Sequence, residues 1–356
     1  MGEIMNVYFS SVIKMDRYKQ IQPYLKESGI SITVEPSKNS LFKILAQFIK
    51  QNRNTIFITN DWLKIPVCML ITHFLRGNPY ILVLNGAFWK GWEEEGWSKA
   101  RIYLYSFLAN LVIRNCSYLV CNSNYIRLDV NKQFPSSRNK TRTIYNGIET
   151  QNSVSFQKFL YSSEKYNFLT INTFDYKEKY KGIIIILEAL SRLFENTARL
   201  CILASINSNM GWDNFNNFKL LVAERFPNIS IDFFTNVNVF EFFDPNNAIF
   251  VYSSNANSPD SLPRAILESQ SAGMPSIIVD TTGCAEAVLP GRTALVVPPD
   301  PDALADAMNL LVNSPVLRRQ MTEEAPGFIA DHFSWNRMAD GYAEIIKMIG
   351  GGRNEN

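Results

Sequence analysis

The amino-acid sequence predicts an α/β fold in which two Rossmann-like, doubly wound domains face each other across a cleft. The chain has 356 residues, a length that suits two domains with separate hydrophobic cores. In both halves, short β-branched or aromatic runs alternate with longer helical patterns, which is typical of parallel sheets covered by helices. A polar passage of low complexity, QNSVSFQKFLYSSEKYN, separates the two alternating series and predicts a linker near residue 155.

The first alternating series places the N-terminal domain at residues 1–155. Gly29 is expected to end its first helix, because glycine adopts the left-handed conformation that closes helices. The predicted elements are, in order, the strand MNVYFSS, a helix over 15–28, the strand ISITV, a helix near 41–51, the strand TIFITND, a helix over 62–75, and the strands YILVLNG and YLVCNS. The strand and turn TIYNGIET then precede the linker.

The second alternating series places the C-terminal domain at residues 156–334. Its predicted strands are NFLTINTF, RLCILAS, NISIDFF, AIFVYSS, SIIVD and TALVV, and a helix begins at Lys181 and Gly182. A final helix over 335–349 is expected to cross back and pack on the N-terminal domain. The sequence GGRNEN after it predicts a frayed tail.

Composition excludes several classes of protein. Lys plus Arg number 35 and Asp plus Glu 33, and a net charge of +2 argues against a nucleic-acid-binding surface spread over the whole chain, which leaves a local basic patch open. The five cysteines form no CxxC pair, so neither a disulfide framework nor a zinc site is expected, and a reducing cytosol fits best. Nowhere do 18 uncharged apolar residues run together, so we expect no membrane-spanning helix.

No cofactor is expected. After the first strand, a dinucleotide-binding domain would carry GxGxxG, but this chain reads SSVIKMDRY, which contains no glycine. The missing motif therefore argues against a nicotinamide or flavin cofactor. The Walker motif of nucleotide hydrolases is also absent.

A segment from Ser258 to Glu286 carries the strongest signal for a ligand. Pro263 suits the first position of a short helix, and Gly273 suits its end. Leu262, just before the helix, has no side-chain oxygen to cap it, so the first amides remain available to an anion such as phosphate. The alternative is an ordinary solvated helix end.

Three polar, glycine-rich loops follow strands of the C-terminal domain and are expected to converge. They read NTFDYKEKYKG, SNANSPDSLP and DTTGCAE. The carboxyl ends of parallel strands meet at one edge of a sheet, where ligands of such folds bind, so we expect a site between the domains. Asp300-Pro301-Asp302 predicts a turn before a helix rather than a metal site. His73 is interpreted as structural, and His332 is a weak catalytic candidate.

Several of these residues together resemble a known family. Asp260 and Glu268 form an acidic pair with seven residues between them, followed by SAGMP and by GCAE. Further matches, in the family's order, are CNS at 121–123, YNGIE at 145–149 and Lys181-Gly182. The chain thus resembles a retaining glycosyltransferase of the GT-B fold, in glycosyltransferase family 4, the glycosyl transferases group 1.

The resemblance implies transfer of a sugar from a nucleoside diphosphate sugar, with retention at the anomeric carbon and no metal. The implied catalytic residues are Asp260, which would hold sugar hydroxyls, Glu268, which would accept bonds from the ribose, and Lys181, which would neutralise the diphosphate. The implied donor-binding residues are Thr173, Ser261, Leu262, Pro263, Glu268, Gly283 and Glu286. Alternatively, Lys181 is a solvated residue at the start of a helix, and Glu286 lies at the N-terminus of the next helix, where its carboxylate interacts favourably with the helix dipole.

The chain departs from the family pattern at three places. The first acidic position is Asp260, where glutamate is usual. The family's arginine ahead of its lysine has no match, because Thr173 or Phe174 stands there, and Lys177 or Lys179 is a possible substitute. The glycine-rich loop after the first strand is missing, and Leu84-Asn85-Gly86 stands where relatives often carry a histidine.

Aromatic and cationic residues mix between Asn85 and Arg114. Such a segment suits a membrane surface and would bring a lipid-linked acceptor to the cleft. The alternative is a loop followed by a core helix, because residues 102–113 are apolar nearly all round, and Glu93 to Glu95 argue against anionic lipids. The residues expected on the acceptor side are Asn85, Gly86, Trp89 and Lys90.

We therefore expect a cytoplasmic, metal-independent, retaining glycosyltransferase that can act at the inner face of the membrane. Its partners would be a nucleotide sugar and a glycan or lipid-linked acceptor, with no nucleic acid. One alternative is a non-catalytic subunit that binds nucleotide or recruits a partner transferase, which Asp260 and the missing arginine motivate. A second is a sugar-nucleotide epimerase, which would need acid–base residues that two poorly placed histidines do not supply.

Overall fold

The structure, a computed structural model, describes residues 5–11, 16–36, 40–61, 64–89, 97–149, 166–193, 197–255 and 261–351. Its described residues form two compact units. Unit 1 contains residues 5–149, Ser261 and the C-terminal segment from Phe333, and unit 2 contains 166–255 and Leu262–His332. The predicted linker, Asp260, Lys90 and the predicted tail beyond Gly351 lie outside the described residues.

Unit 1 is built on a parallel sheet of six strands in the order β2-β1-β3-β4-β5-β6. The strands are β1 (Met5–Ser11), β2 (Ile30–Pro36), β3 (Ile56–Thr59), β4 (Tyr80–Leu84), β5 (Tyr118–Cys121) and β6 (Thr141–Thr143). The helices are α1 (Asp16–Glu27), α2 (Leu41–Lys50), α3 (Lys64–Arg76), α4 (Lys99–Asn115), α5 (Asn124–Gln133), the 3-10 turn η1 (Pro135–Ser137) and α12 (Trp335–Gly351).

Unit 2 is built on a second parallel sheet in the order β12-β11-β10-β7-β8-β9. The strands are β7 (Tyr166–Thr173), β8 (Ala198–Ser205), β9 (Ser230–Thr235), β10 (Ala248–Tyr252), β11 (Ser276–Val279) and β12 (Leu295–Val297). The helices are α6 (Lys177–Tyr180), α7 (Gly182–Leu193), α8 (Asn209–Arg225), α9 (Arg264–Ser271), α10 (Pro301–Asn313) and α11 (Pro315–Phe333), with the 3-10 turns η2 (Val239–Phe242) and η3 (Cys284–Ala287).

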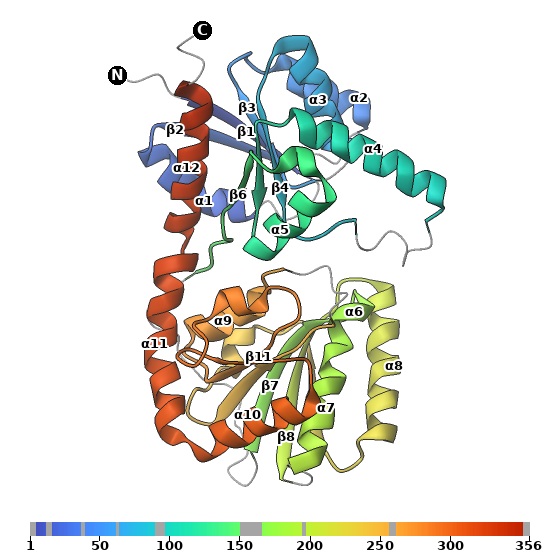
Figure 1. Cartoon of the computed structure of the whole chain (residues 1–356), viewed down its shortest axis with the longest axis vertical. Helices are drawn as coiled ribbons and strands as arrows, with labels where there is room; N and C mark the ends of the chain where they lie inside the picture. The colour runs from blue at the N-terminus through green and yellow to red at the C-terminus, as the bar shows by residue number, and fades with distance from the viewer. Residues whose placement is uncertain are drawn as a thin grey trace. The chain divides into compact units, whose positions relative to one another are not determined.

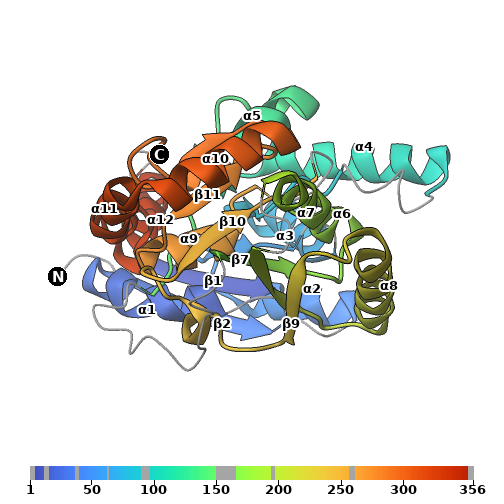
Figure 2. The same cartoon turned by 90° about the horizontal axis from the view of Figure 1, so that it is seen from below.

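The predicted class of each domain, a doubly wound α/β fold, is confirmed, because helices flank a parallel sheet in each unit (Figures 1 and 2). In unit 1, alternate residues of one strand enter different core clusters: Tyr8 packs in one, and Val7 and Phe9 pack in the other. A strand that buries side chains on both of its faces reads as a continuous apolar run, which is why the sequence revealed these strands.

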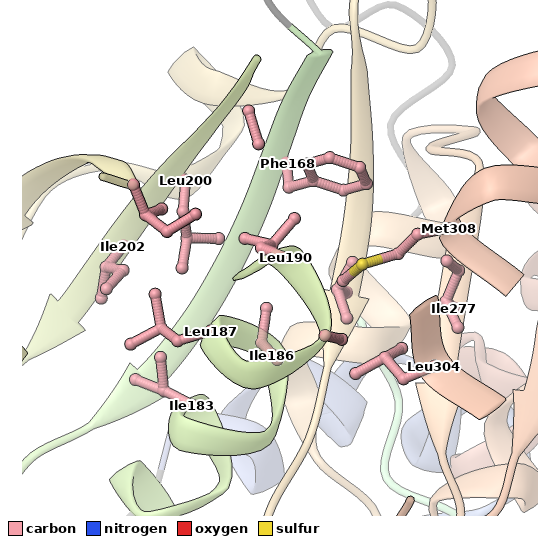
Figure 3. Close-up of a cluster of buried hydrophobic side chains, with 14 of the residues drawn as sticks. Phe168, Ile183, Ile186, Leu187, Leu190, Leu200, Ile202, Ile277, Leu304 and Met308 are labelled. Carbon is pink, nitrogen blue, oxygen red and sulfur yellow. The ribbon is translucent and has the colours of Figure 1, made fainter. Parts of the chain in front are cut away.

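The core of unit 2 forms where α7 and α10 pack on the sheet (Figures 2 and 3). Ile183, Ile186, Leu187 and Leu190 recur at helical spacing along α7, and all four are fully buried. Figure 3 shows these side chains among those of Phe168, Leu200, Ile202, Ile277, Leu304 and Met308. The predicted helix that begins at Lys181 and Gly182 therefore serves as the central packing element of this core.

Helix α12 packs in unit 1 although it follows unit 2 in the sequence. It contacts α1, and Figure 1 draws the red α12 beside the blue α1. Tyr342 of α12 and Tyr18 of α1 are both buried, and their hydroxyl oxygens lie 3.2 Å apart. Gly147 makes room for Trp335 at the start of this helix, because a Cβ at Gly147 would lie 2.5 Å from the Trp335 ring.

All five cysteines are free and buried, as the absence of CxxC pairs predicts. Burial raises the pKa of Cys68 to about 11 and the pKa values of Cys116, Cys121 and Cys201 to about 12. These four thiols therefore stay protonated at neutral pH and are poor nucleophiles. Among the described residues, no helix is both long enough and apolar enough to span a membrane.

Candidate functional site at the carboxyl edge of unit 2

The candidate site lies at the point where the strand order of unit 2 reverses. From β7 the chain builds β8 and β9 on one side, and from β10 it builds β11 and β12 on the other. In doubly wound sheets the connections diverge at this switch point and leave a crevice at the carboxyl ends of the two central strands. The first place to look for a ligand is therefore beyond Thr173 of β7 and Tyr252 of β10.

Backbone and side-chain contacts join the loops that follow β7 and β10. Asn172 Nδ2 donates to the carbonyl oxygen of Ser253 at 3.4 Å. A Cβ at Gly182 would lie 2.5 Å from that same carbonyl oxygen and 2.6 Å from Ser254 Cα. Only glycine therefore lets the first turn of α7 approach β10 this closely, and Lys181, which is exposed, stands at the beginning of that turn.

The third predicted loop joins the other two through Thr281. The hydroxyl oxygens of Thr281 and Ser254 lie 2.8 Å apart, and the Asp280 amide donates to Val297 O at 2.8 Å. The described parts of the three loops thus meet at one edge of the sheet, as the sequence predicted. This arrangement brings Lys181, β10 and the loop that leads to η3 together around the switch point.

Helix α9 begins one residue later than predicted. Pro263 has φ −64° and ψ 125°, so it is the N-cap residue and Arg264 is the first helical residue. The predicted position of Pro263 was wrong because its fixed φ suits an extended N-cap as well as a helix. No side chain caps this end, which agrees with the prediction that its first turn has no capping oxygen.

The other end of α9 closes as predicted. Gly273 adopts φ +70°, a left-handed conformation that side chains disfavour, and its amide donates to Gln270 O at 3.0 Å. A Cβ at Gly273 would also lie 2.8 Å from Thr322 O of α11. Glycine is therefore needed here both for its backbone conformation and for packing.

The carboxylate of Glu268 is held by an ion pair within α9. Its Oε1 accepts from Arg264 Nε at 2.6 Å, at the i, i+4 spacing that helices favour. The Glu268 side chain is 14% exposed, whereas Arg264 is 55% exposed. The pair fixes the carboxylate beside the first turn of α9, where it can accept further hydrogen bonds from a ligand's hydroxyls.

Leu262 and Pro263 are buried ahead of α9. Ser261, which belongs with unit 1, is also buried, and its hydroxyl donates to Asn122 Oδ1 at 2.7 Å. The Ser261 side chain therefore already has a protein partner, so any part that it plays toward a phosphate falls to its backbone.

Asp175 is a site residue that sequence reasoning missed. Its carboxylate accepts from the backbone amides of Asn207 and Ser208 at 2.9–3.1 Å, from Asn207 Nδ2 at 2.9 Å and from Ser208 Oγ at 2.7 Å. A Cβ at Gly211 would lie 2.4 Å from Asp175 Oδ1. Asp175 thereby ties the loop after β7 to the start of α8.

The pKa of Asp175 lies below its usual range. Burial alone would raise this pKa, but the hydrogen bonds that Asn207 and Ser208 donate to the ionised carboxylate outweigh the burial. The only local signal for this role is the position of Asp175 two residues after a strand. Its partners lie 32 and 33 residues further along the chain, where no sequence periodicity links them to it.

The two residues at the position of the family's arginine have different surroundings. Phe174 is fully buried and stacks on Tyr180, with ring centroids 4.8 Å apart, so its side chain belongs to the core. Thr173 is half-buried, and its hydroxyl donates to Ser205 O at 3.0 Å. Of the proposed substitutes, Lys179 Nζ lies 5.3 Å from the centroid of the Tyr176 ring, and the side chain of Lys177 lies outside the described set.

Gly283 and Glu286 form a tight turn after β11. Gly283 adopts φ +77° and precedes η3, and the Glu286 amide donates to Gly283 O at 3.1 Å. Glu286 lies in the first turn of η3, a single 3-10 turn of four residues, so the alternative role at a helix N-terminus remains open beside the ligand role. The Glu286 side chain is half-buried.

The predicted acceptor-side residues lie after β4 in unit 1. Asn85 Oδ1 accepts from Arg17 Nη1 at 3.4 Å, and Asn85 O accepts from Asn122 Nδ2 at 3.3 Å. Gly86 O accepts from the Phe88 amide. Trp89 is half-buried and contacts Phe88 and Phe134 edge-on, so much of its ring serves packing.

The remaining candidates contact nearby protein groups. Asp300 caps α10 by accepting from the Asp302 amide at 2.7 Å, and Asp302 pairs with Arg192, as expected for a turn before a helix. His73 Nδ1 lies 2.9 Å from Asn78 O, and His332 Nδ1 lies 3.0 Å from Phe328 O. Within the described ranges, no group of three His, Cys, Asp or Glu residues is placed to hold a metal ion.

Two family models match the chain. The model "Glycosyl transferases group 1" matches residues 152–328, and "Glycosyltransferase Family 4" matches residues 31–152. Together they reach from β2 of unit 1 into α11 of unit 2, and the first covers the candidate site. Among curated proteins, spore coat protein SA of Bacillus subtilis is 22% identical over 256 residues, which are 67% of this chain and 66% of that protein.

Solved structures share the fold at low sequence identity. Alr3699/HepE of Anabaena, in complex with UDP, has a TM-score of 0.72 at 16% identity, over 97% of this chain and all of that one. Sucrose-phosphate synthase of Thermosynechococcus elongatus has a TM-score of 0.76 at 15% identity, over 98% of this chain and all of that one. A glycosyltransferase of Rickettsia africae has a TM-score of 0.73 at 16% identity, over 98% and 99%.

Proposed function

Because the chain belongs to the glycosyl transferases group 1 family, we propose that it moves a hexose-type sugar from a nucleoside diphosphate sugar to a lipid-linked or polysaccharide acceptor. The proposed reaction retains the configuration of the anomeric carbon and needs no metal. The C-terminal domain would bind the donor, and the N-terminal domain would bind the acceptor. The first donors to test carry uridine, since Alr3699/HepE was solved with UDP and with UDP-glucose.

The convergence of three loops at the switch point of unit 2 carries this proposal. Gly182 sets Lys181 and the first turn of α7 against the end of β10, and Thr281 brings in the loop that leads to η3. A phosphate bound at this edge would meet one cation and the amino end of α9, which no side chain caps. An uncharged substrate would gain little from this combination.

In the proposed mechanism the protein lowers the barrier chiefly by stabilising the leaving group. As the bond between the anomeric carbon and the diphosphate oxygen breaks, positive charge grows on the sugar and negative charge on the departing diphosphate. Lys181 and the amides at the start of α9 would neutralise the diphosphate. The acceptor oxygen attacks from the same face, loses its proton to the leaving phosphate oxygen, and so preserves the configuration.

Glu268 would orient the donor from the ribose side. Its carboxylate is fixed by Arg264 and can accept hydrogen bonds from the two ribose hydroxyls. Asp260, Gly283, Glu286 and Thr173 complete the proposed donor site, with Asp260 on the sugar hydroxyls. Asn85, Gly86, Lys90 and Trp89 are proposed for the acceptor. The protein would work in the cytoplasm, at the inner face of the membrane when the acceptor is lipid-linked.

Calorimetry followed by product analysis tests the proposal. The full chain is titrated with UDP, GDP and ADP and with their glucose or mannose conjugates, and one donor series should bind in the micromolar range. Turnover with that donor and a lipid or glycan extract should release the nucleoside diphosphate, and NMR of the product should show the donor's anomeric configuration. An inverted product would refute retention, and an isomerised nucleotide sugar would indicate an epimerase.

Phe174 favours one further candidate, a non-catalytic subunit that binds a nucleotide sugar or recruits a partner transferase. Thr173 or Phe174 stands where the family carries an arginine, and neither side chain is charged, so this position supplies no second cation to the diphosphate. Tight binding of a nucleotide sugar without release of nucleoside diphosphate in any extract would support this second function.

A further inference from the structure

The first half of α4 is an apolar helical segment that unit 1 leaves uncovered. None of the residues from Lys99 to Leu108 is buried, and the buried residues of α4 begin only at Ala109. Six residues of this half are large and apolar or aromatic: Ile102, Tyr103, Leu104, Tyr105, Phe107 and Leu108. Figures 1 and 2 show α4 extending beyond the other helices of unit 1.

The most exposed side chains of this segment share one side of the helix. Tyr103 is 78% exposed, Leu104 53% and Phe107 57%. At 3.6 residues per turn, they lie opposite Ala109, Val112 and Ile113, the residues by which α4 packs on unit 1. The exposed apolar stripe therefore faces away from the core of its own unit.

The charge of α4 has a single sign. The helix contains no Asp or Glu, and it carries Lys99 and Arg101 at its start and Arg114 at its end. The guanidinium carbon of Arg101 lies 3.7 Å from the centroid of the Trp97 ring. Cations in a first turn oppose the helix dipole, and a negatively charged surface beside them would offset that cost. Glu93 to Glu95, which precede this helix, lie outside the described residues.

We propose that the first half of α4 docks on an anionic lipid surface. Tyr103, Leu104 and Phe107 enter the headgroup region, where aromatic and aliphatic side chains gain most from leaving water. Lys99 and Arg101 face the lipid phosphates. The proposal extends the proposed function by naming the surface that brings the protein to a lipid-linked acceptor, but it rests on the exposure and charge of α4 and does not require transfer to occur.

A second copy of the chain fits this stripe less well than a lipid surface does. If two α4 helices paired antiparallel about Phe107, Lys99 of one copy would face Arg114 of the other. If they paired in parallel, Lys99 would face Lys99. Both arrangements place like charges together, which disfavours association, whereas anionic lipid complements every charge on the helix.

Sedimentation with vesicles tests the docking. The full chain is mixed with vesicles of phosphatidylcholine alone or of phosphatidylcholine with 30% phosphatidylglycerol, without any sugar nucleotide. We expect binding to the anionic vesicles only, with an apparent affinity that falls as salt is added. The double variants Tyr103→Ser/Phe107→Ser and Lys99→Glu/Arg101→Glu should each bind about tenfold more weakly or worse.

Leu220→Ser is the matched control, because Leu220 of α8 is 71% exposed but belongs to unit 2. This variant should bind vesicles like the unaltered protein. Equal binding to neutral and anionic vesicles, or unchanged binding by both double variants, would overturn the proposal. The proposal would also be overturned if light scattering showed a dimer of the unaltered protein and a monomer of the variant Tyr103→Ser/Phe107→Ser. Nucleotide-sugar binding by the double variants should stay unchanged, which separates a failure of docking from a failure of the proposed transferase.

Discussion

At the scale of single residues, Asp175 supplies the clearest case of a carboxylate whose ionised form the fold requires. Five hydrogen bonds from Asn207 and Ser208 converge on it. Because these bonds lower its pKa in the folded state, its contribution to stability is present above the pKa of the unfolded chain and is lost as the pH falls through the folded-state pKa.

Asp175→Asn should therefore destabilise unit 2 at pH 7 by about 1 kcal/mol at most, because the new amide nitrogen would face donors, while solvent at this partly exposed site offsets part of the loss. Amide hydrogen exchange at Asn207 and Ser208 should become faster. The gap in stability between the variant and the original protein should narrow as the pH drops below about 4. Asp306→Asn, an exposed position on α10, is the control, and a gap that does not change with pH would contradict this account.

Glu268 and Glu188 form a matched pair for testing the donor site. Both are helical carboxylates of unit 2 that pair with an arginine at 2.6 Å, Glu268 with Arg264 and Glu188 with Arg225. Glu268→Gln should weaken nucleotide-sugar binding at least tenfold, because a charged acceptor of ribose hydrogen bonds is lost. Glu188→Gln should leave binding unchanged. Calorimetry measures both, and equal effects would show that Glu268 acts only through its ion pair.

At the scale of secondary structure, the start of α7 depends on one missing side chain. Gly182→Ala places a Cβ against the backbone of Ser253 and Ser254, which cannot rotate away. We expect a loss of about 1–3 kcal/mol from overpacking, together with weaker nucleotide binding as Lys181 shifts. Gly327→Ala in α11 is the control, since a Cβ there meets no atom within 4 Å and should stabilise the helix slightly. The unfolding temperature should fall in Gly182→Ala and rise slightly in Gly327→Ala.

Sequence patterns located most strands but left some helices unpredicted. The strands are continuous apolar runs in buried parallel sheets, so their signal is local. The long helix α11 gave no such signal, because Pro326 and Gly327 interrupt its sequence and predict a break that the packed helix does not make. For α4, apolar content suggested a core helix, but only its second half is covered, since sequence cannot tell which apolar face finds a partner.

In the candidate site, too, the sequence predicted local features but not the contacts between distant segments. Local signals predicted Gly273 at the end of α9 and the loops after β7, β10 and β11, and they placed the start of α9 to within one residue at Pro263. The contact of Gly182 with Ser253 and the bonds of Asp175 could not be predicted, because each joins loops that are separated by 30 residues or more in sequence. Contacts of that range become visible only when the sheet order is known.

At the scale of the whole molecule, unit 1 depends on a helix from the other end of the chain. Tyr342→Ala should destabilise unit 1 by about 3–5 kcal/mol, because it empties a buried aromatic position against Tyr18. Tyr342→Phe removes only the hydroxyl contact and should cost about 1 kcal/mol. Hydrogen exchange should show faster opening of α1 and β1 in Tyr342→Ala, with unit 2 protected as before. If Tyr342→Ala accelerated hydrogen exchange equally in both units, the two cores would not be independent.

The return of α12 to unit 1 also sets an order of events during synthesis. Tyr18, Ile21 and Leu25 of α1 pack with α12 in a common core cluster, so unit 1 cannot complete its core until α12 leaves the ribosome. Unit 2, whose elements end at α11, can close first. A nascent chain would therefore expose the apolar face of α1 until α12 is synthesised, and a chaperone could bind that face in the meantime.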